Sequence, residues 1–419
     1  MAAPALAIAP PARAERQRLD HPLRLIISAA FLLRCSQSAA TVLLGFYLAH
    51  LSSAGQPVTA AWSAVLLSSS YGVEILLAPS MGALSDRFGR KPFIAAAPVA
   101  GVLGVLMYLS GNLPALFAGR ALEGLAAAAL TPAVLGYVAE HTAEVPDLRT
   151  RTMAYFEIAV LVGNALGLTA GGILWQRVAE GAFQAPAALY LVGALLVGLW
   201  LPSGGARPRA ETTSIGQTLA LARTPRVLSF LPAWLCMTAV IGLWANNIVF
   251  QLAGARRPGQ LLAGGLSGDQ VSSVLAAFTL TLIVGTLIWA RSYRLFKRKT
   301  SSMLLALAGL MATAVEIVAL NHVAAGRPIL LVVLALSVAL ESGFTPVALA
   351  YIADITEGFP ADRGAIMGLY SIVLGLGQVL GGSVGGPFAQ AWGLDGMAML
   401  TLALGGIATA TVVGLRRER

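Results

Sequence analysis

A small set of ionisable residues lies inside long apolar segments of this 419-residue sequence. An ionisable side chain in hydrocarbon costs at least about 2.5 to 3.5 kcal/mol, so such a residue is by default expected to bind an ion or a substrate. Carboxylates in this setting could take up a proton or a cation, and an arginine could tune a neighbouring carboxylate. The set comprises Arg34, Glu74, Arg120, Glu123, Glu157, Glu316 and Glu341.

Three of these residues lie deep in their segments. Glu74 lies about 18 Å from Asp86 at 1.5 Å of helical rise per residue, Glu341 is near the middle of its segment, and Arg34 lies slightly closer to one end. We predict that Glu74 and Glu341 are the main proton- or cation-binding carboxylates and that Arg34 tunes their pKa. The alternative is a static buried ion pair that holds the two halves of the chain together.

Other polar residues accompany these charges at helical spacing. They form one stripe on the first apolar segment and another on the tenth, namely Arg34, Gln37, Ser38 and Thr41, and Ser337, Glu341 and Thr345. A polar stripe on a membrane helix must face protein or water. The two stripes therefore predict positions that line a shared cavity.

The remaining charges have a structural alternative. Arg120 and Glu123 are three residues apart and are expected to pair with each other, although a role in proton or substrate binding stays open. Glu157 fits a gate at one membrane surface as well as it fits the cavity. Glu316 lies towards the outer end of its segment, so we predict that it reaches the membrane surface as a snorkelling side chain.

The elements that position these residues are membrane-spanning helices. The sequence is 57% hydrophobic and 11% charged, with a mean hydropathy of +0.77, which excludes a soluble domain. Since a span needs about 20 apolar residues, the sequence predicts an all-α membrane protein with twelve spans. They lie near residues 23–50, 60–83, 92–110, 114–139, 152–175, 186–202, 227–252, 271–290, 301–321, 328–353, 365–391 and 396–415.

The distribution of charge predicts orientation and partners. Most of the 28 basic residues fall in joints on the side of both termini, so the net charge of +9 reports a positive-inside bias and not a nucleic-acid partner. We expect a multi-pass inner-membrane protein with cytoplasmic termini, in contact with lipid and monomeric. Cys35 and Cys236 lie within spans and give no disulfide or metal-ligand spacing, so we expect no metal or cofactor.

An internal repeat divides the chain. The segment from Thr131 to Thr142 matches the segment from Thr345 to Thr356 at an offset of 214 residues, and the register continues into the next span. Because this offset covers six spans, the halves share one orientation. The predicted domains are a disordered tail at 1–22, a six-helix bundle at 23–202, a cytoplasmic linker at 203–226 and a second six-helix bundle at 227–415.

The joint after the second span carries the most specific motif. Its sequence from Gly82 to Pro92, GALSDRFGRKP, resembles the loop signature known as motif A of the major facilitator superfamily. The resemblance implies two parallel six-helix bundles and a cytoplasmic latch that is closed in the outward-open state. The expected gate residues are Gly82, Asp86, Arg87, Gly89, Arg90 and Lys91, joined by Glu140, Arg149, Arg151, Asp354 and Arg363. The corresponding loop of the second half, from Arg291 to Lys299, keeps the basic charge but lacks the Asp and the glycines.

Two further segments resemble the superfamily. The segment from Leu116 to Gly124 is similar to its fourth-helix motif, with Arg120 as the characteristic basic residue and Glu123 where Gln is more usual. The family also lines its cavity with helices one, four, seven and ten, which adds Asn246, Asn247 and Gln251 on the seventh span. The candidate cavity set is therefore Arg34, Gln37, Glu74, Arg120, Glu123, Asn246, Asn247, Gln251, Glu341 and Thr345.

Glycines recur at helical spacing in the fifth and eleventh spans. They are Gly163, Gly167, Gly171 and Gly172, matched by Gly377, Gly381, Gly385 and Gly386. Small residues let helices approach closely, and the alternative is that they let helices slide or bend during transport. The first group resembles the motif of the proton-coupled drug antiporter branch, although Leu168 stands where that branch has proline.

These observations predict a secondary transporter that works by alternating access. We favour proton-coupled efflux of lipophilic or amphiphilic compounds, because the expected cavity helices are mostly apolar. The alternative is a proton-linked importer of a polar or anionic nutrient, for which Arg34 could bind a substrate carboxylate. A membrane enzyme and a non-transporting sensor are remote alternatives, since the sequence has no metal triad, nucleotide-binding loop or nucleophile motif.

Overall fold

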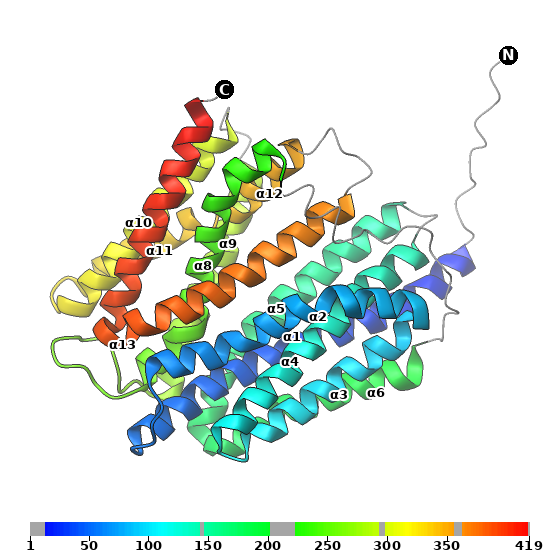
Figure 1. The fold of residues 1–419 in the computed structure, drawn as a ribbon, viewed down its shortest axis with the longest axis horizontal. Coiled ribbons are helices and arrows are strands. Elements are labelled where there is room, and N and C mark those ends of the chain that lie inside the picture. The colour runs from blue at the N-terminus through cyan, green and yellow to red at the C-terminus, as the bar shows by residue number, and fades with distance from the viewer. Residues whose placement is uncertain (1–12, 143–145, 202–222, 293–297, 356–362, 418–419) are drawn as a thin grey trace.

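The computed structural model describes residues 13–142, 146–201, 223–292, 298–355 and 363–417 (Figure 1). Its helices in chain order are α1 Arg13–Ser53, α2 Ala60–Phe88, α3 Arg90–Tyr108, α4 Leu113–His141, α5 Pro146–Val178, the short 3-10 helix η1 Ala179–Phe183, α6 Gln184–Trp200, α8 Pro225–Ala253, α9 Gly268–Ser292, α10 Lys299–His322, α11 Arg327–Glu341, α12 Phe344–Ile355 and α13 Arg363–Arg417. Helices suit these apolar segments because each satisfies its backbone polar groups internally in lipid.

The helices supply the twelve predicted spans. Among the described residues, ten helical stretches are long and apolar enough to cross a membrane. Two of the ten contain two spans each: Arg151–Trp200 has 50 residues and includes α5 and α6, and Ile372–Arg416 has 45 residues within α13. Within α13 the backbone bends at Gly393, where φ is 61°. The twelve-span, all-helical fold is therefore confirmed.

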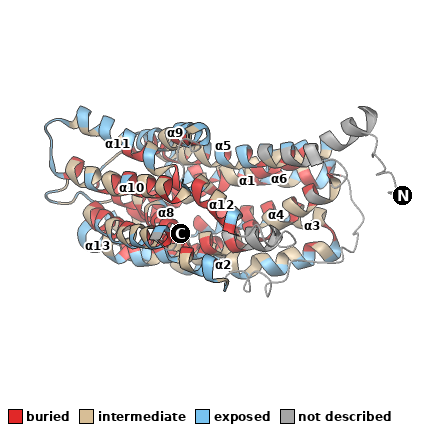
Figure 2. Cartoon of the chain, turned by 90° about the horizontal axis from the view of Figure 1, so that it is seen from above, coloured by how far each residue is buried: buried red, intermediate tan, exposed pale blue. Residues whose placement is uncertain are grey.

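Two bundles follow the internal repeat. Helices α1 to α6 form the first bundle and α8 to α13 form the second (Figure 1). The repeat register is exact at the fourth span, because α4 covers residues 113–141 and the pair α11 and α12 covers 327–355. Large apolar side chains such as Leu76, Leu199, Leu280 and Ile329 are exposed, as expected for helices in contact with lipid, and Figure 2 shows exposed positions along the helices of both bundles.

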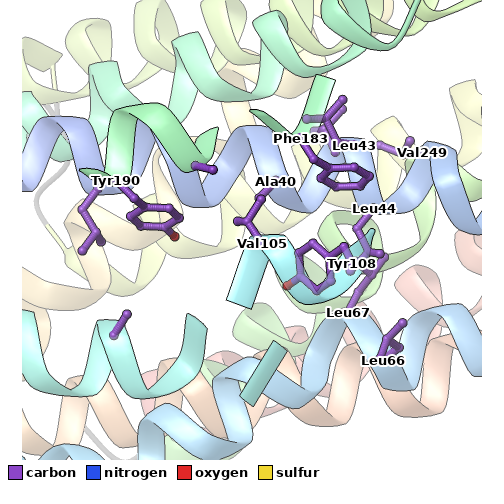
Figure 3. Packing of buried hydrophobic residues seen from close by; sticks show 14 of the residues in the cluster. Ala40, Leu43, Leu44, Leu66, Leu67, Val105, Tyr108, Phe183, Tyr190 and Val249 are labelled. Atoms are coloured by element: carbon purple, nitrogen blue, oxygen red, sulfur yellow. The ribbon is translucent and has the colours of Figure 1, made fainter. Parts of the chain in front are cut away.

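The repeated glycines lie where helices pack closely. A Cβ at Gly167 of α5 would come within 2.3 Å of the Cys35 carbonyl oxygen on α1, and a Cβ at Gly381 of α13 would come within 1.8 Å of the Ala239 carbonyl oxygen on α8. These contacts confirm that the glycines allow close approach. In the first bundle, buried side chains including Leu44, Tyr108 and Phe183 fill the remaining space (Figure 3).

Within the described residues, the hydrogen bonds between the two bundles lie towards one end. We call the membrane face where α1 begins and α13 ends the terminus side, and the opposite face the far side. Three hydrogen bonds join the bundles within the described residues, and all lie towards the far side: Ser68 with Ser383, Gly268 with Gln176, and Ser272 with the Thr169 carbonyl. In Figure 1 the bundles diverge towards the terminus side, which gives the molecule a V shape.

Two predicted boundaries differ from the structure. The first helix begins at Arg13 rather than after residue 22, because residues 13–19 are mostly strong helix formers. The tenth span is not one helix: α11 ends at Glu341 and α12 begins at Phe344. Residues 1–12 and most of the predicted linker, 202–222, lie outside the described residues.

Candidate functional site

The Arg34 guanidinium joins side chains of several helices in the first bundle. Its Nη1 donates to Gln37 Oε1 at 2.9 Å, one turn along α1, and its Nη2 donates to Thr131 Oγ1 on α4 at 3.4 Å. On the same stripe, Ser38 donates to the Asn164 amide oxygen on α5 at 2.7 Å. The stripe predicted on the first span therefore faces protein, as a polar stripe in lipid must.

Two carboxylates lie within electrostatic reach of Arg34. Glu74 on α2 and Glu157 on α5 both have Arg34 as their interacting cation. Arg34 and Glu74 are partly buried and Glu157 is exposed, so the group is accessible. We call Arg34, Gln37, Glu74, Thr131 and Glu157 the Arg34 cluster. Its chemistry allows a proton to bind to either acid, or an anion to bind against the guanidinium.

Arg120 and Glu123 pair with each other on α4, which confirms that alternative. Arg120 Nη1 lies 2.6 Å from Glu123 Oε2, and each residue is only 1% exposed. The hydroxyls of Tyr108 on α3 and Tyr190 on α6 donate to the same carboxylate, and the second Arg120 amino group donates to Ser70 Oγ on α2 at 2.5 Å. The pair is thus enclosed within the first bundle and does not line a cavity in this conformation.

The candidates on the seventh span are buried rather than open. Asn246, Asn247 and Gln251 are each less than 10% exposed on α8. The amides of Asn246 and Asn247 donate to backbone carbonyls one turn back in the same helix, at 2.9 and 2.8 Å. Because the bundles meet at the far side, where these residues lie, packing covers them in this conformation. Thr345, on α12, is exposed.

Glu341 does not join Arg34. It lies in the second bundle, where its neighbouring groups are Thr313 and Glu316 of α10, and the described residues include no contact between it and the Arg34 cluster. The described contacts therefore join Arg34 with Glu74 but not with Glu341, and a cavity shared by all three stays a prediction. Helical rise gives only depth, and it does not give the direction in which a side chain points.

The structure differs from the prediction that Glu316 reaches the membrane surface, which rested on its distance from the span end. Instead, Glu316 Oε1 accepts a hydrogen bond from Ser337 Oγ on α11 at 2.9 Å. Ser337 lies one turn before Glu341 on the polar stripe of the tenth span. A sequence signal for this contact was available in that stripe, since a polar stripe on one helix needs a polar partner on the helix it faces.

The motif from Gly82 to Pro92 forms ion pairs at the terminus side. Arg90 pairs with Asp86 one turn away and with Glu140 on α4, where Nε lies 3.0 Å from Oε1. Gly82 packs against α4, where a Cβ would lie in ordinary contact at 3.4 Å from Pro132 Cβ, so this packing does not require glycine. Gly89 has a φ of 94°, a conformation that glycine adopts readily, at the turn between α2 and α3. These pairs lie within the first bundle.

A second ion pair occupies the matching place in the second bundle. Asp354 on α12 pairs with Lys299 at 2.6 Å, and the same ammonium donates to the Ala350 carbonyl at 2.8 Å. Lys299 was not among the partners expected for Asp354. Of the other gate candidates, Arg87 stacks on Phe88 and Arg151 on Tyr155, and no polar partner is described for Lys91. The side chains of Arg149 and Arg363 lie outside the described set.

Comparison with known proteins identifies the family. The model described as the Major Facilitator Superfamily matches residues 26–257 and 261–419. The chain belongs to the major facilitator superfamily. This assignment agrees with the two six-helix bundles and makes the chain a member of a transporter family rather than an enzyme family.

Several members of the superfamily resemble the chain over part of its length. "Inner membrane transport protein YajR" of Escherichia coli is 26% identical over 73% of this chain and 64% of its own length. "Lysophospholipid transporter LplT" of Shigella flexneri is 31% identical over 46% of this chain and 44% of its own, so the chain spans less than two thirds of these relatives. "Multidrug resistance protein 1" of Bacillus subtilis is 25% identical over 75% of this chain and 77% of its own.

Solved structures of superfamily transporters share the fold. The nucleoside transporter NupG aligns with a TM-score of 0.75 at 15% identity, over 95% of this chain and 98% of that one. A peptide transporter, POT, in complex with sulfate aligns with a TM-score of 0.71 at 18% identity, over 94% of each chain. At such low identity these similarities establish the arrangement of helices and leave the cargo open.

Proposed function

We propose that this chain is a proton-coupled secondary transporter that exports lipophilic or amphiphilic compounds from the cytoplasm. The observation that carries the proposal is the Arg34 cluster, in which one guanidinium on α1 lies within electrostatic range of carboxylates on α2 and α5. A carboxylate beside an arginine can exchange the arginine for a proton during the cycle, which is a simple means of coupling.

Alternating access would use the V-shaped arrangement of the bundles. The far-side contacts open and the terminus side closes as the two halves rock about the membrane midplane. The pairs of Arg90 with Glu140 and of Lys299 with Asp354 lie at the terminus side of each half, where they would form the gate. We place both termini in the cytoplasm of an inner membrane because the basic residues gather on that side.

The export direction rests on two kinds of support. The mostly apolar helices suit an apolar cargo, and relatives bear the names of a multidrug resistance protein, a tetracycline resistance protein and a lysophospholipid transporter. The alternative is a proton-linked importer of a polar or anionic nutrient. Arg34 favours it, because a partly buried guanidinium can bind a carboxylate, and the structural neighbours include nucleoside and peptide transporters.

Transport by the purified protein in liposomes tests the proposal. A fluorescent lipophilic cation and a nucleoside serve as probes, each with a proton gradient imposed in either direction. We expect gradient-driven movement of the lipophilic cation opposite to the protons, and a loss of at least about tenfold in Glu74→Gln, because an amide cannot titrate. Glu180→Gln, on the exposed helix η1, is the matched control. Movement of the nucleoside with the protons would instead support the importer.

Full gradient-driven transport in both Glu74→Gln and Glu341→Gln would show that the coupling site is assigned wrongly. Exchange of probe without a gradient separates coupling from binding. If Glu74→Gln keeps exchange and loses only gradient-driven movement, its role is in coupling.

A further inference from the structure

Helices α10 and α11 pack unusually closely where Glu341 lies. A Cβ at Gly309 of α10 would come within 2.7 Å of Leu340 Cβ and within 2.8 Å of the Ser337 carbonyl oxygen. Thr313 and Glu316 follow Gly309 by four and seven residues, so they lie on the same face of α10 and point towards α11. On α11 the facing residues are Ser337 and Glu341. The interface between these helices therefore contains two carboxylates and two hydroxyls.

Several polar atoms of this interface lack partners. Ser337 satisfies one oxygen of Glu316. In the described part of the chain, the other Glu316 oxygen and one Glu341 oxygen are buried without a close hydrogen bond, and the Thr313 hydroxyl lies beside the Glu341 carboxylate. Thr313 is only 6% exposed. Because an unpaired buried polar group costs free energy, two such carboxylate oxygens on facing helices indicate that the site binds a ligand.

The charge of the site points to a cation. The Glu316 carboxylate acts electrostatically on Glu341, and a like charge beside a buried carboxylate favours compensation by a cation. The other ionisable groups on the described parts of the surrounding helices lie mostly at helix ends, and no described ion pair joins one of them to either carboxylate. They are Asp269 and Arg291 on α9, Lys299 and His322 on α10, Arg327 on α11, Tyr351 and Asp354 on α12, and Asp395 and Arg416 on α13.

The break in the tenth span also favours a cation at this site. Helix α11 ends at Glu341, so the partial negative charge of its carbonyl end lies next to that residue. Trp289 Nε1 on α9 donates to the carbonyls of Ala339 and Leu340, each at 3.1 Å, and its indole lies against Gly343. Broken membrane helices place such ends beside cations in other transporters.

The internal repeat provides a comparison within the same chain. At the offset of 214 residues, Ser337 corresponds to Glu123 and Leu334 to Arg120. In the first bundle the carboxylate between α3 and α4 has its own guanidinium, at 2.6 Å. In the second bundle the carboxylates between α10 and α11 face no guanidinium, because a leucine takes the place of the arginine. In the first bundle Arg120 supplies the positive charge beside the carboxylate. In the second bundle a cation from solution would have to supply it.

We propose that Glu316 and Glu341, together with Ser337 and Thr313, form a binding site for one monovalent cation between α10 and α11. The cation is a proton or an alkali metal ion, since either compensates one carboxylate. The site is separate from the Arg34 cluster and lies in the other bundle. Its use in coupling rests on the proposed function, but its occupancy does not.

Titration of the purified full-length protein by infrared spectroscopy tests the site without any substrate. The protonated carboxyl band is followed against pH in choline chloride and in sodium chloride, and subtraction of the matching Glu341→Gln spectrum isolates the Glu341 band. We expect Glu316→Gln to lower the proton affinity of Glu341 by about tenfold or more, because it removes a like charge. Glu180→Gln is the control and is expected to leave the midpoint unchanged.

The two cations give different results. A Glu341 band that sodium removes at fixed pH identifies an alkali metal ion, and a band indifferent to sodium identifies a proton; either supports the site. The proposal is overturned if Glu341 shows no titration or if Glu316→Gln leaves its midpoint unchanged. Glu341→Asp keeps a carboxyl group and shifts its band, so it gives the assignment where Glu341→Gln does not fold. Absence of gradient-driven transport in the wild type would refute the proposed function and leave this titration intact.

Discussion

Charged residues inside the bundles differ in how their charge is compensated. Glu123 forms an ion pair with Arg120 and accepts hydrogen bonds from two tyrosine hydroxyls. Glu74 and Glu157 lie within electrostatic range of Arg34 but form no described ion pair with it. Burying a charge is expensive unless it is paired and hydrogen-bonded. The fully compensated pair is therefore suited to holding helices together, and the loosely compensated cluster is suited to exchanging partners.

Removal of Arg120 tests this structural role. Arg120→Met leaves the Glu123 carboxylate buried without its cation, and breaking a buried pair typically costs about 3 to 5 kcal/mol. We expect a large fall in the melting temperature of the purified protein. The double variant Arg120→Met with Glu123→Leu removes both charges and is expected to recover much of that loss. Equal losses in the single and double variants would show that the pair itself is not the stabilising feature.

At the scale of helices, hydropathy predicted every span because apolar length is a local property. The repeat predicted the correspondence of α4 with α11 and α12, since it preserves register over whole spans. The break at Ser342 and Gly343 was not predicted, because its cause is tertiary. The indole of Trp289 lies where a Gly343 side chain would be, and the first half has Ala127 to Ala129 in the matching place. Likewise, depth along a helix could not show that Glu341 points towards α10.

Close packing of α5 on α9 gives an element-scale prediction. A Cβ at Gly172 would lie 2.3 Å from Ser272 Oγ and 2.5 Å from the Gly268 carbonyl oxygen, so Gly172→Ala separates the bundles at the far side. We expect faster labelling of a single cysteine at Ser383 by a water-soluble maleimide. Gly198→Ala is the matched control, because nothing lies within 4 Å of that Cβ. Equal labelling rates in the two variants would show that this contact does not hold the far side closed.

At the scale of the whole molecule, the halves touch at the far side and diverge at the terminus side (Figure 1). Under the proposed alternating access, this arrangement is one end state of the rocking motion. No sequence feature indicated which end state it would be, because the two differ in contacts between the same helices.

A cysteine pair across the halves tests whether this state is occupied and must be left during transport. The hydroxyls of Ser68 on α2 and Ser383 on α13 lie 3.4 Å apart, so Ser68→Cys with Ser383→Cys is expected to form a disulfide under mild oxidation, in a background with Cys35 and Cys236 replaced by serine. We expect transport to stop on oxidation and to return on reduction. Continued transport with the disulfide formed would exclude the rocking motion, and either single cysteine serves as the control.

The far end of the second bundle is bound together by polar contacts. Arg257, in the connection after α8, donates to the carbonyls of Ala389 and Ala391 beside the bend of α13, and Asp395 accepts from Asn321 and pairs with His322 of α10. These hydrogen bonds and this ion pair hold the helix ends together. We therefore expect this end to move as one unit during the proposed rocking, with any bend of the tenth span falling at Ser342 and Gly343, the residues between α11 and α12 and next to the proposed cation site.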